Sequence, residues 1–306
     1  MSAPQTFTEK QLRFTFTLGT NAKFQGNNNT LVVTGLRATA DIVFPGPPSF
    51  PTATVRIYGM KPSDMTALTG LTFQTLTYNR NSIMIEANSG SGWTTVFAGQ
   101  MVTTVPDFAA QPDVALQIFA QTLGYDLLNP ATPTSFPTAA SFEQVLRTIV
   151  LKMSQDFDNE GVTGSFSGPT YFAGTPADQL RAAAKKAGVV FYADIPGSAS
   201  EGNIPGVVTI GLPGVARNLP QWVLTPTSGL EGYPTLDSVN LIGVEAVFNP
   251  ALRFGAPLQI KDSRQLAANG NWVIYDCSHR LSSLMPDGPW FTKMTAQPPV
   301  GFGITQ

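Results

Sequence analysis

Two long stretches of this chain alternate apolar and polar residues at a period of two, and this pattern limits the possible folds more than any other feature. Such alternation is typical of β-strands that pack on one face, because successive side chains point to opposite sides. In TATVRIYGM, Val55 and Ile57 point to one face, and Arg56 and Tyr58 point to the other. DVALQIFAQTLG, near residue 121, fits a strand or a helix. Clusters of Gly, Pro and Asn separate the runs and predict antiparallel strands; the runs from residue 12 onward are LRFTFTLG, LVVTGLRATADIVF, TATVRIYGM, TLTYNRNSIMIEA and WTTVFAGQMVTTV.

The region from about 122 to 220 has helical spacing instead. In SFEQVLRTIVLKMS the apolar residues form one stripe, Ser141 is a capping residue, and Gln144 is placed to complete the cap. In TPADQLRAAAKKAG, Thr175 caps the first turn, Pro176 suits its first position, and Gly188 ends the helix. The run VVFYAD follows directly and is expected to pair with GVVTIGL. This region therefore predicts a small helix-plus-hairpin module.

The strand pattern returns after residue 221, in SVNLIGVEAVF, APLQIKD, NWVIYDCSHRLSS and WFTKMTAQP. The order of a β region, an α/β module and a second β region predicts a mainly β chain with an α/β insertion, in the α+β class. With 306 residues the chain is long enough for two or three compact modules. We place them at 1–121, 122–220 and 221–306, and the symmetry suggests two similar antiparallel β-barrels in one chain.

The composition excludes several classes of function. Charged residues make up only 12% of the chain, which indicates that much of its surface meets other protein. The net charge of -2 provides no basic field for specific nucleic-acid binding. One cysteine and one histidine cannot form an internal disulfide or a four-ligand zinc site. No charged leader with an apolar core begins the sequence, and no apolar run approaches the roughly 20 residues that span a bilayer, so we expect a soluble chain without stable membrane insertion.

The cysteine and the histidine, Cys277 and His279, lie two positions apart in GNWVIYDCSHRLSS. Regular alternation would place them on one strand face together with Val273 and Tyr275, with Ile274 on the opposite face. A catalytic thiol needs a base within hydrogen-bond reach and an environment that stabilises the thiolate, often a helix N-terminus. Two side chains on a flat strand, with Cβ atoms roughly 6.5 to 7 Å apart, meet neither condition well. We therefore expect a buried cysteine and a hydrogen-bonded histidine in a sheet.

The stretch DFDNEG is similar to the opening of a calcium-binding loop, since Asp156, Asp158 and Glu160 alternate before Gly161. The twelfth position of such a loop would be Ser167, which has no carboxylate to bind calcium through two oxygens. The sequence after it also does not have the pattern of an exiting helix. We therefore expect a solvated acidic helix end in place of a calcium site.

Other chemistry rests on residues that only the fold can bring together. Two acids in one cleft would suit glycoside cleavage, and the candidates are Glu86, Glu231, Asp237 and Glu245. Tryptophans can stack on sugars, but positions in or beside strands favour core or subunit contacts; they are Trp93, Trp222, Trp272 and Trp290. No phosphate-binding G-x-x-x-x-G-K-[ST] loop, strand-linked G-x-G-x-x-G motif or H-E-x-x-H motif occurs. The sequence predicts no catalytic, cofactor-binding or metal-ligating residue and no cofactor.

Three stretches resemble the baseplate hub (tail hub) proteins of tailed bacteriophages, including the late control and Mu-like hub family. ATVRIYGM with TLTYNRNSIMIEANSGSGWTTVFAGQMV resembles the first tube-like barrel of such hubs, with its tryptophan strand and FAG turn. SVNLIGVEAVFNPALRFGAPLQIKDS is similar to the strand, NP, glycine, strand sequence of the second barrel. GNWVIYDCSHRLSS resembles the strand that closes that barrel. Together these stretches span most of the chain, and they are strand and turn patterns without an invariant catalytic residue.

The resemblance implies a homotrimer in which each chain contributes two tube-like antiparallel barrels, so that three chains form a pseudo-sixfold ring. Such a ring would connect the hexameric tail tube to the trimeric central spike, contact other baseplate proteins, and surround a lumen through which DNA passes during ejection. The protein would assemble in the host cytoplasm and reside in the baseplate of the virion. Some hubs carry a cell-wall hydrolase, whereas the residues of this chain show no hydrolase constellation, so we expect a structural protein and no enzyme.

Two other functions are compatible with the same sequence. A tail tube or distal tail protein would form sixfold rings from single barrels. A glycan-binding or glycan-cleaving tail component would use the acids and tryptophans named above. Counting the copies in the purified oligomer distinguishes a hub, with three copies, from a tail tube or distal tail protein, with six. Release of glycan products would distinguish a glycan-cleaving component from a hub.

Overall fold

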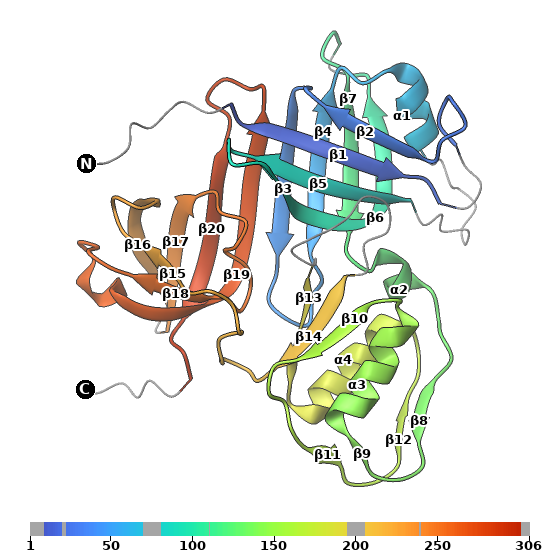
Figure 1. Cartoon of the computed structure of the whole chain (residues 1–306), viewed down its shortest axis with the longest axis vertical. Helices are drawn as coiled ribbons and strands as arrows, with labels where there is room; N and C mark the ends of the chain where they lie inside the picture. The colour runs from blue at the N-terminus through green and yellow to red at the C-terminus, as the bar shows by residue number, and fades with distance from the viewer. Residues whose placement is uncertain are drawn as a thin grey trace.

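Most strands of the chain belong to one large sheet. Figure 1 shows the computed structural model, which describes residues 9–19, 23–69, 81–109, 111–194, 206–238 and 240–300. In the described residues this sheet has 13 strands, and its main path runs β16-β17-β20-β19-β3-β4-β7-β6-β5-β1-β2, with β18 beside β19 and β15 beside β18. Its strands are β1 (Gln11–Thr17), β2 (Thr30–Thr34), β3 (Ala38–Phe44), β4 (Thr52–Tyr58), β5 (Ser82–Asn88), β6 (Trp93–Asp107), β7 (Ala115–Gln121), β15 (Trp222–Leu224), β16 (Leu230–Ser238), β17 (Leu241–Val247), β18 (Pro257–Ile260), β19 (Gly270–Ser283) and β20 (Trp290–Gln297).

The two β regions meet where β3 pairs with β19. This pairing is antiparallel and places Phe44 opposite Cys277 and Ala40 opposite Leu281, residues more than 200 positions apart in the chain. One hydrophobic core accompanies the sheet and takes residues from both β regions. The mainly β, largely antiparallel architecture predicted from the alternation is therefore confirmed. In the described residues the sheet path is open, with β2 and β16 at its ends, so two closed barrels per chain stay a prediction.

The alternation places individual side chains correctly in regular strands. In β4, Val55 and Ile57 are buried, Arg56 is exposed, and Tyr58 is half-buried under the Arg37 guanidinium, 4.0 Å from the ring centre. The ambiguous segment near residue 121 forms β7, which pairs with β4 and β6 along its whole length. Strands β4 and β6, on either side of β7, supply main-chain hydrogen bonds, and these stabilise the segment as a strand.

A second core lies in the inserted α/β region. It packs α3 (Phe142–Lys152) and α4 (Pro176–Ala187) against a three-stranded sheet of order β10-β14-β13. The strands are β10 (Asp156–Asn159), β13 (Val190–Asp194) and β14 (Val207–Gly211). The predicted β13–β14 pairing is confirmed and antiparallel, and β10, which the sequence pattern did not predict, adds in parallel. The three-module division at 1–121, 122–220 and 221–306 stays a prediction.

Both predicted helices begin at the expected caps. The Ser141 hydroxyl accepts a hydrogen bond from the Gln144 backbone N–H at 3.1 Å, and the Thr175 hydroxyl accepts one from Asp178 at 3.1 Å. Gly188 ends α4 at φ 68°, a left-handed conformation that favours glycine. The hydroxyl groups of Ser and Thr accept hydrogen bonds from N–H groups of the first helical turn. The starts of these helices can therefore be predicted from the local sequence.

Several short elements have no clear sequence signal. Two small ribbons extend from the α/β region at its end away from the large sheet (Figure 1). They are β8 (Thr134–Phe136) with β12 (Thr170–Phe172), and β9 (Ala140–Ser141) with β11 (Ser165–Phe166). Helices α1 (Pro62–Leu68) and α2 (Gly124–Leu128) and the 3-10 turn η1 (Leu266–Ala268) are equally short. Among the described residues, none of the helices combines the length and apolar character needed to cross a membrane.

A buried polar cluster ties the ribbon of β8 and β12 to the helices. Gln179 of α4 is fully buried, and its side-chain carbonyl accepts hydrogen bonds from Thr134 at 2.7 Å and Lys152 at 3.2 Å. Lys152 also donates to the Thr132 carbonyl at 2.6 Å, and burial lowers the pKa of Lys152 below its ordinary value. Gln179, Thr134 and Lys152 thereby satisfy one another, which helps a short ribbon keep a fixed position.

Candidate functional site

The cysteine and histidine of β19 are core residues. Cys277 is 2% exposed, and its thiol contacts the Leu252 carbonyl oxygen at 3.3 Å. His279 is 1% exposed, and its Nδ1 lies 2.9 Å from the Thr292 hydroxyl. Burial, together with the positive charge of Arg253, lowers the pKa of His279 to about 3. The imidazole is therefore neutral at ordinary pH, as expected of a buried histidine without an acidic partner. The prediction of a buried cysteine and a hydrogen-bonded histidine is confirmed.

The predicted grouping of side chains on this strand is wrong at one end. The pairing of β19 with β20 shifts register between Ile274 and Asp276, which marks a β-bulge at Tyr275. As a result Ile274 belongs to the same core as Cys277, while Tyr275 is 40% exposed. One extra residue reverses the alternation, so a pattern that assumes a regular strand assigns both side chains to the wrong face.

The first acidic candidate, Glu86, is held in an ion pair. Its two carboxylate oxygens each accept a hydrogen bond at 2.6 Å from Arg13 of the neighbouring strand β1. The Arg13 guanidinium also lies 4.6 Å from the ring centre of Trp93. Two parallel hydrogen bonds and a stacked ring fix both partners, so Glu86 and Trp93 contribute to the packing of β1 against β5 and β6.

Two other acidic candidates do come together. Glu231 of β16 and Glu245 of β17 are direct partners across an antiparallel pair. Lys293, opposite Glu245 on β20, forms an ion pair with Glu245 at 3.2 Å. Asp237 lies further along β16, where it accepts a hydrogen bond from Thr235 at 3.0 Å. These side chains lie on an exposed strand surface, whereas acid catalysis of glycoside cleavage uses carboxyl groups that flank a bound sugar in a cleft.

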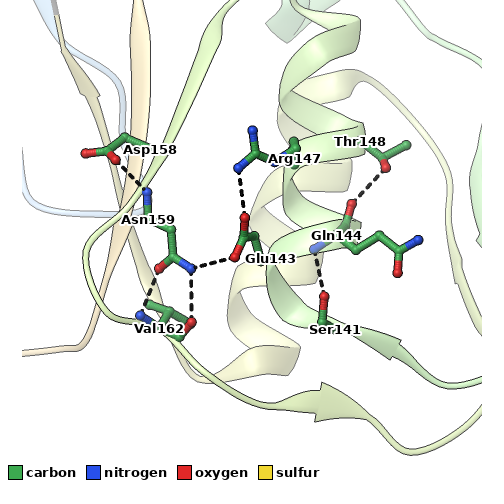
Figure 2. Close-up of polar contacts among 8 residues, drawn as sticks. All are labelled: Ser141, Glu143, Gln144, Arg147, Thr148, Asp158, Asn159 and Val162. Atoms are coloured by element: carbon green, nitrogen blue, oxygen red, sulfur yellow. Dashed lines mark hydrogen bonds and ion pairs between the residues drawn. The ribbon is translucent and has the colours of Figure 1, made fainter.

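The stretch DFDNEG is a strand, so the expected helix end is wrong. Its first four residues form β10, which adds to β14. Asp156 and Asp158 are exposed, whereas Glu160 forms an ion pair with the buried Arg217 at 3.6 Å. Figure 2 shows how the strand end is connected: the Asn159 amide donates to Glu143 at 3.1 Å and to the Val162 carbonyl at 3.0 Å. The hydrogen bonds from Arg147 and Asn159 lower the pKa of Glu143 below its ordinary value. Within the described ranges, no three His, Cys, Asp or Glu side chains come together as metal ligands would.

The tryptophans divide between core and surface. Trp290 is buried and makes an edge-to-face contact with Phe248, with ring centres 5.3 Å apart. Trp272 is half-buried and donates its indole N–H to the Ala268 carbonyl at 2.8 Å. Trp222 on β15 is exposed. The predicted core role is confirmed for Trp290, while Trp222 stays available for contact with another molecule.

The ends of the large sheet are the most distinctive exposed features. β2 carries no charge and no proline, and its Val32 side chain is 51% exposed. β16, at the other end, exposes Tyr233 and Leu236, but Pro234 and two register shifts interrupt it. Proline and bulges protect an edge from strand addition, whereas a regular uncharged edge invites it. The sequence pattern identified β2, within the run LVVTGLRATADIVF, but did not identify β16, and only the strand order shows that both strands terminate the sheet.

Comparison with known proteins gives a likeness in fold. No protein-family model matches the chain, and no curated protein matches it. Among solved structures, it is similar to the 43 kDa tail protein of prophage MuSo2 from Shewanella oneidensis, with TM-score 0.62, 10% identity, and coverage of 95% of this chain and 97% of that one. It is also similar to the tail protein from Neisseria meningitidis MC58, with TM-score 0.59, 9% identity, and coverage of 93% and 96%.

A third likeness is to the PdpA-VgrG complex of Francisella. In the half-lidded structure of that complex the TM-score is 0.53 and the identity is 8%, with coverage of 94% of this chain and 58% of the matched chain. At these identities the comparison concerns backbone arrangement alone. The chain therefore has the mainly β fold, with an α/β part, that is seen in phage tail proteins, and it matches two of them along nearly their entire length.

Proposed function

We propose that this chain is a structural hub protein of a phage tail baseplate, which as a trimer joins the hexameric tail tube to the trimeric spike. The observation that carries this proposal is the shared fold along nearly the full length of two phage tail proteins. The strand and turn patterns that resemble baseplate hubs favour the hub among tail proteins.

The proposed function is mechanical. Three chains that each contribute two similar β units present six comparable positions on one side and three on the other, so a ring of them converts sixfold contacts into threefold contacts. An exposed sheet end is a template for pairing with another chain, and cyclic symmetry covers such ends at every subunit boundary. β2, with its uncharged regular edge, is the strand that such a boundary would cover. The net charge of -2 suits a lumen through which DNA slides without sticking.

No chemical step belongs to this function. The candidate carboxylates Glu86 and Glu245 are engaged in ion pairs with Arg13 and Lys293, and the imidazole of His279 is buried in the core. We propose that the protein binds other tail proteins and catalyses no reaction.

Counting the copies in the native assembly tests the proposal. Native mass spectrometry of the purified full chain, over protein concentrations from about 0.1 to 10 µM, is expected to give three copies, because specific interfaces of ordinary size persist in this range. Six copies would favour a tail tube or distal tail ring. A monomer that stays soluble at every concentration would contradict both. Electron microscopy of labelled particles is expected to place the chain at the tail tip and not along the tail.

The glycan-cleaving alternative rests on one observation, the opposition of Glu231 and Glu245 across β16 and β17. Incubation of the full chain with peptidoglycan or host polysaccharide is expected to release no product. Release that disappears in Glu231→Gln and Glu245→Gln, with Asp64→Asn as a surface control, would overturn the structural proposal.

A further inference from the structure

A cavity of about 800 Å³ lies where the inserted α/β region meets the second β region. β13 contributes Val190 and Tyr192 to its wall, and β19 contributes Val273 and Tyr275, so we call it the Tyr275 cavity. Its volume lies in the range of about 300 to 1,000 Å³ that is typical of ligand pockets. None of the described residues that line it is charged. A charged ligand would therefore lose its hydration there without an opposite charge in return.

A β-bulge gives Tyr275 its place in this wall. The register shift between Ile274 and Asp276 turns Tyr275 away from the core, and the residue lines the cavity while 40% exposed. Gly46 leaves room for the ring, since a Cβ atom there would lie 3.3 Å from it. Bulges are frequent next to functional sites because they redirect a side chain. Tyrosines supply a large contact area and a hydroxyl, and they often contribute most of the binding energy of an interface.

Three aromatic rings follow one another along the wall. The ring centre of Phe254 lies 4.8 Å from that of Tyr192 and 6.3 Å from that of Tyr275, and all three residues line the cavity. The planes of neighbouring rings are tilted by 46° and 87°, so the rings do not stack flat on one another. A polyproline II segment advances about 9 Å in each three-residue turn, a length comparable to this series of rings. Domains that recognise such segments bind them in grooves lined by aromatic side chains.

Prolines form a further part of the wall. They are Pro47, Pro213, Pro298 and Pro299. The proline ring fixes φ, so these residues lose little conformational freedom when a ligand binds. A polyproline II ligand is also ordered before it binds. Association of two such preordered surfaces costs less conformational entropy than association of two flexible ones.

The polar side chains of the wall are few, and they favour a peptide over a glycan. They are those of Tyr192, Tyr275, Asn240 and Gln297, and each can donate hydrogen bonds. A polyproline II segment has no internal hydrogen bonds, so its carbonyl groups need a small number of donors from the partner. A sugar chain carries many hydroxyl groups, and a mainly apolar wall would leave several of them without partners, at a cost for each.

From these observations we propose that the Tyr275 cavity binds an uncharged, proline-containing peptide segment of a partner protein in the polyproline II conformation, with Tyr275 as its main contact. Because the wall takes residues from β13, β19 and β20, the bound segment would bridge the α/β region and the large sheet. This inference goes beyond the hub proposal and does not depend on it, since it concerns one chain in any assembly.

Calorimetric titration of the full chain with capped octaproline tests the proposal. Saturable binding of one peptide per chain is expected. A capped Gly-Ser repeat of the same length is expected to bind at least about tenfold more weakly, because it is flexible before binding. Equal affinity for the two peptides, or no saturable binding of octaproline up to about 5 mM, would overturn the proposal.

Substitutions at Tyr275 test its role, and they are expected to keep the fold because the residue lies outside both hydrophobic cores. Tyr275→Ser is expected to weaken octaproline binding at least about tenfold, and Tyr275→Phe, which keeps the ring, is expected to weaken it less. Tyr233→Ser is the matched control, since Tyr233 is an exposed tyrosine of β16 outside the cavity. Equal affinities of the two serine variants would overturn the assignment.

Methyl NMR of the full chain locates the bound probe. Octaproline is expected to shift the methyl signals of Val190 and Val273, which line the cavity, and to leave those of Val32, on the distant edge strand β2, unchanged. Unchanged signals of the two cavity valines at saturation would overturn this site. Tighter binding of chitohexaose or maltohexaose than of octaproline, with the same signals shifted, would assign the cavity to glycans and overturn the peptide proposal.

Discussion

At the scale of single residues, the role of a side chain in this protein depends mainly on which strands and rings surround it, and less on its own chemical type. The ring of His279 lies 5.5 Å from that of Phe44 and 5.3 Å from that of Phe248, and its Nδ1 lies 2.9 Å from the Thr292 hydroxyl. Such surroundings favour the neutral imidazole and remove it from acid-base chemistry. The same side chain then becomes a source of pH-dependent stability.

The pKa of His279 in the fold, about 3 instead of 6.5, predicts that stability falls as the solution becomes acidic. Between these two values the unfolded chain binds a proton at this imidazole and the folded chain does not, so the contribution is complete above pH 6.5 and is lost as the pH falls toward 3. In His279→Gln, which keeps a hydrogen-bonding group, the free energy of unfolding is expected to depend less steeply on pH from 6.5 to 5, by up to about 1.4 kcal/mol per pH unit.

Denaturant unfolding at several pH values measures this difference. The variant is expected to differ from the original chain by a constant amount between pH 7.5 and 8.5, where the imidazole is neutral in both states. Identical pH dependence below 6.5 would show that His279 is protonated in the fold.

At the scale of secondary-structure elements, helix ends follow local rules, whereas strand edges follow neighbours. α3 and α4 begin at side-chain caps that their own sequences supply. The exposure of β2, in contrast, depends on its place at the end of the sheet path. Helices with side-chain caps contribute to the stability of one chain. Exposed edge strands are expected to determine how chains associate.

The cap of α4 predicts a measurable change in stability. Thr175→Ala removes the acceptor for the Asp178 N–H and is expected to lower the free energy of unfolding by about 1 kcal/mol. Thr175→Ser keeps the hydroxyl and is expected to lose less than half of that. Thermal or denaturant unfolding measures both, and an alanine variant as stable as the serine variant would contradict the role of this cap.

The edge strand β2 predicts a change in assembly. Val32→Lys places a charge on an uncharged edge and is expected to weaken self-association at least tenfold, because a buried boundary disfavours an unpaired lysine. Leu266→Lys, at the exposed turn η1, is the matched control and is expected to leave the oligomer intact. Analytical ultracentrifugation measures both, and normal assembly of the Val32 variant would exclude β2 from the boundary.

At the scale of the whole molecule, the α/β region and the large sheet are fastened together by a close contact. Gly255, which precedes β18, lies so close to Arg217 and Tyr192 that a Cβ atom would be 2.6 Å from the arginine side chain and 2.7 Å from the tyrosine ring. The Arg217 guanidinium in turn lies 4.5 Å from the ring centre of Tyr192. Tyr192 belongs to β13 and Gly255 to the second β region, so this contact joins the α/β region to the large sheet.

A substitution that disturbs this contact is expected to uncouple the unfolding of the α/β region from that of the large sheet. Gly255→Ala adds a methyl group against the side chains of Arg217 and Tyr192 at φ 80° and is expected to lower the free energy of unfolding by about 2 to 4 kcal/mol. Gly232→Ala carries the same kind of backbone strain, at φ 67°, but no atom lies within 4 Å of its new methyl group. The control is therefore expected to cost about 1 to 2 kcal/mol.

Calorimetry distinguishes these variants by the shape of the transition. The Gly255 variant is expected to unfold in two separate steps, one for each core, while the Gly232 variant unfolds as the unaltered chain does. Equal destabilisation by the two substitutions would show that the contact carries no coupling between the cores.

The sequence by itself determined the local structure. Alternation at a period of two identified most of the long strands, though not β16, and side-chain caps located α3 and α4, because these signals depend on neighbours within a few residues. It also predicted that Cys277 and His279 form no reactive pair, because two side chains on one face of a flat strand lie too far apart and lack an environment that stabilises the thiolate. It did not predict β10 or the ribbons of β8 and β12, whose short runs carry too little periodicity.

The tertiary structure alone decided which distant segments became neighbours. It placed β3 beside β19, gave Ile274 rather than Tyr275 to the core through a bulge, and left β2 at the end of the sheet. Pairing between strands and the position of a bulge depend on contacts between separate segments of the chain, and a local pattern contains no information about them. For the same reason the cavity of about 800 Å³ whose walls include Pro47, Tyr192 and Tyr275 exists only in the folded chain.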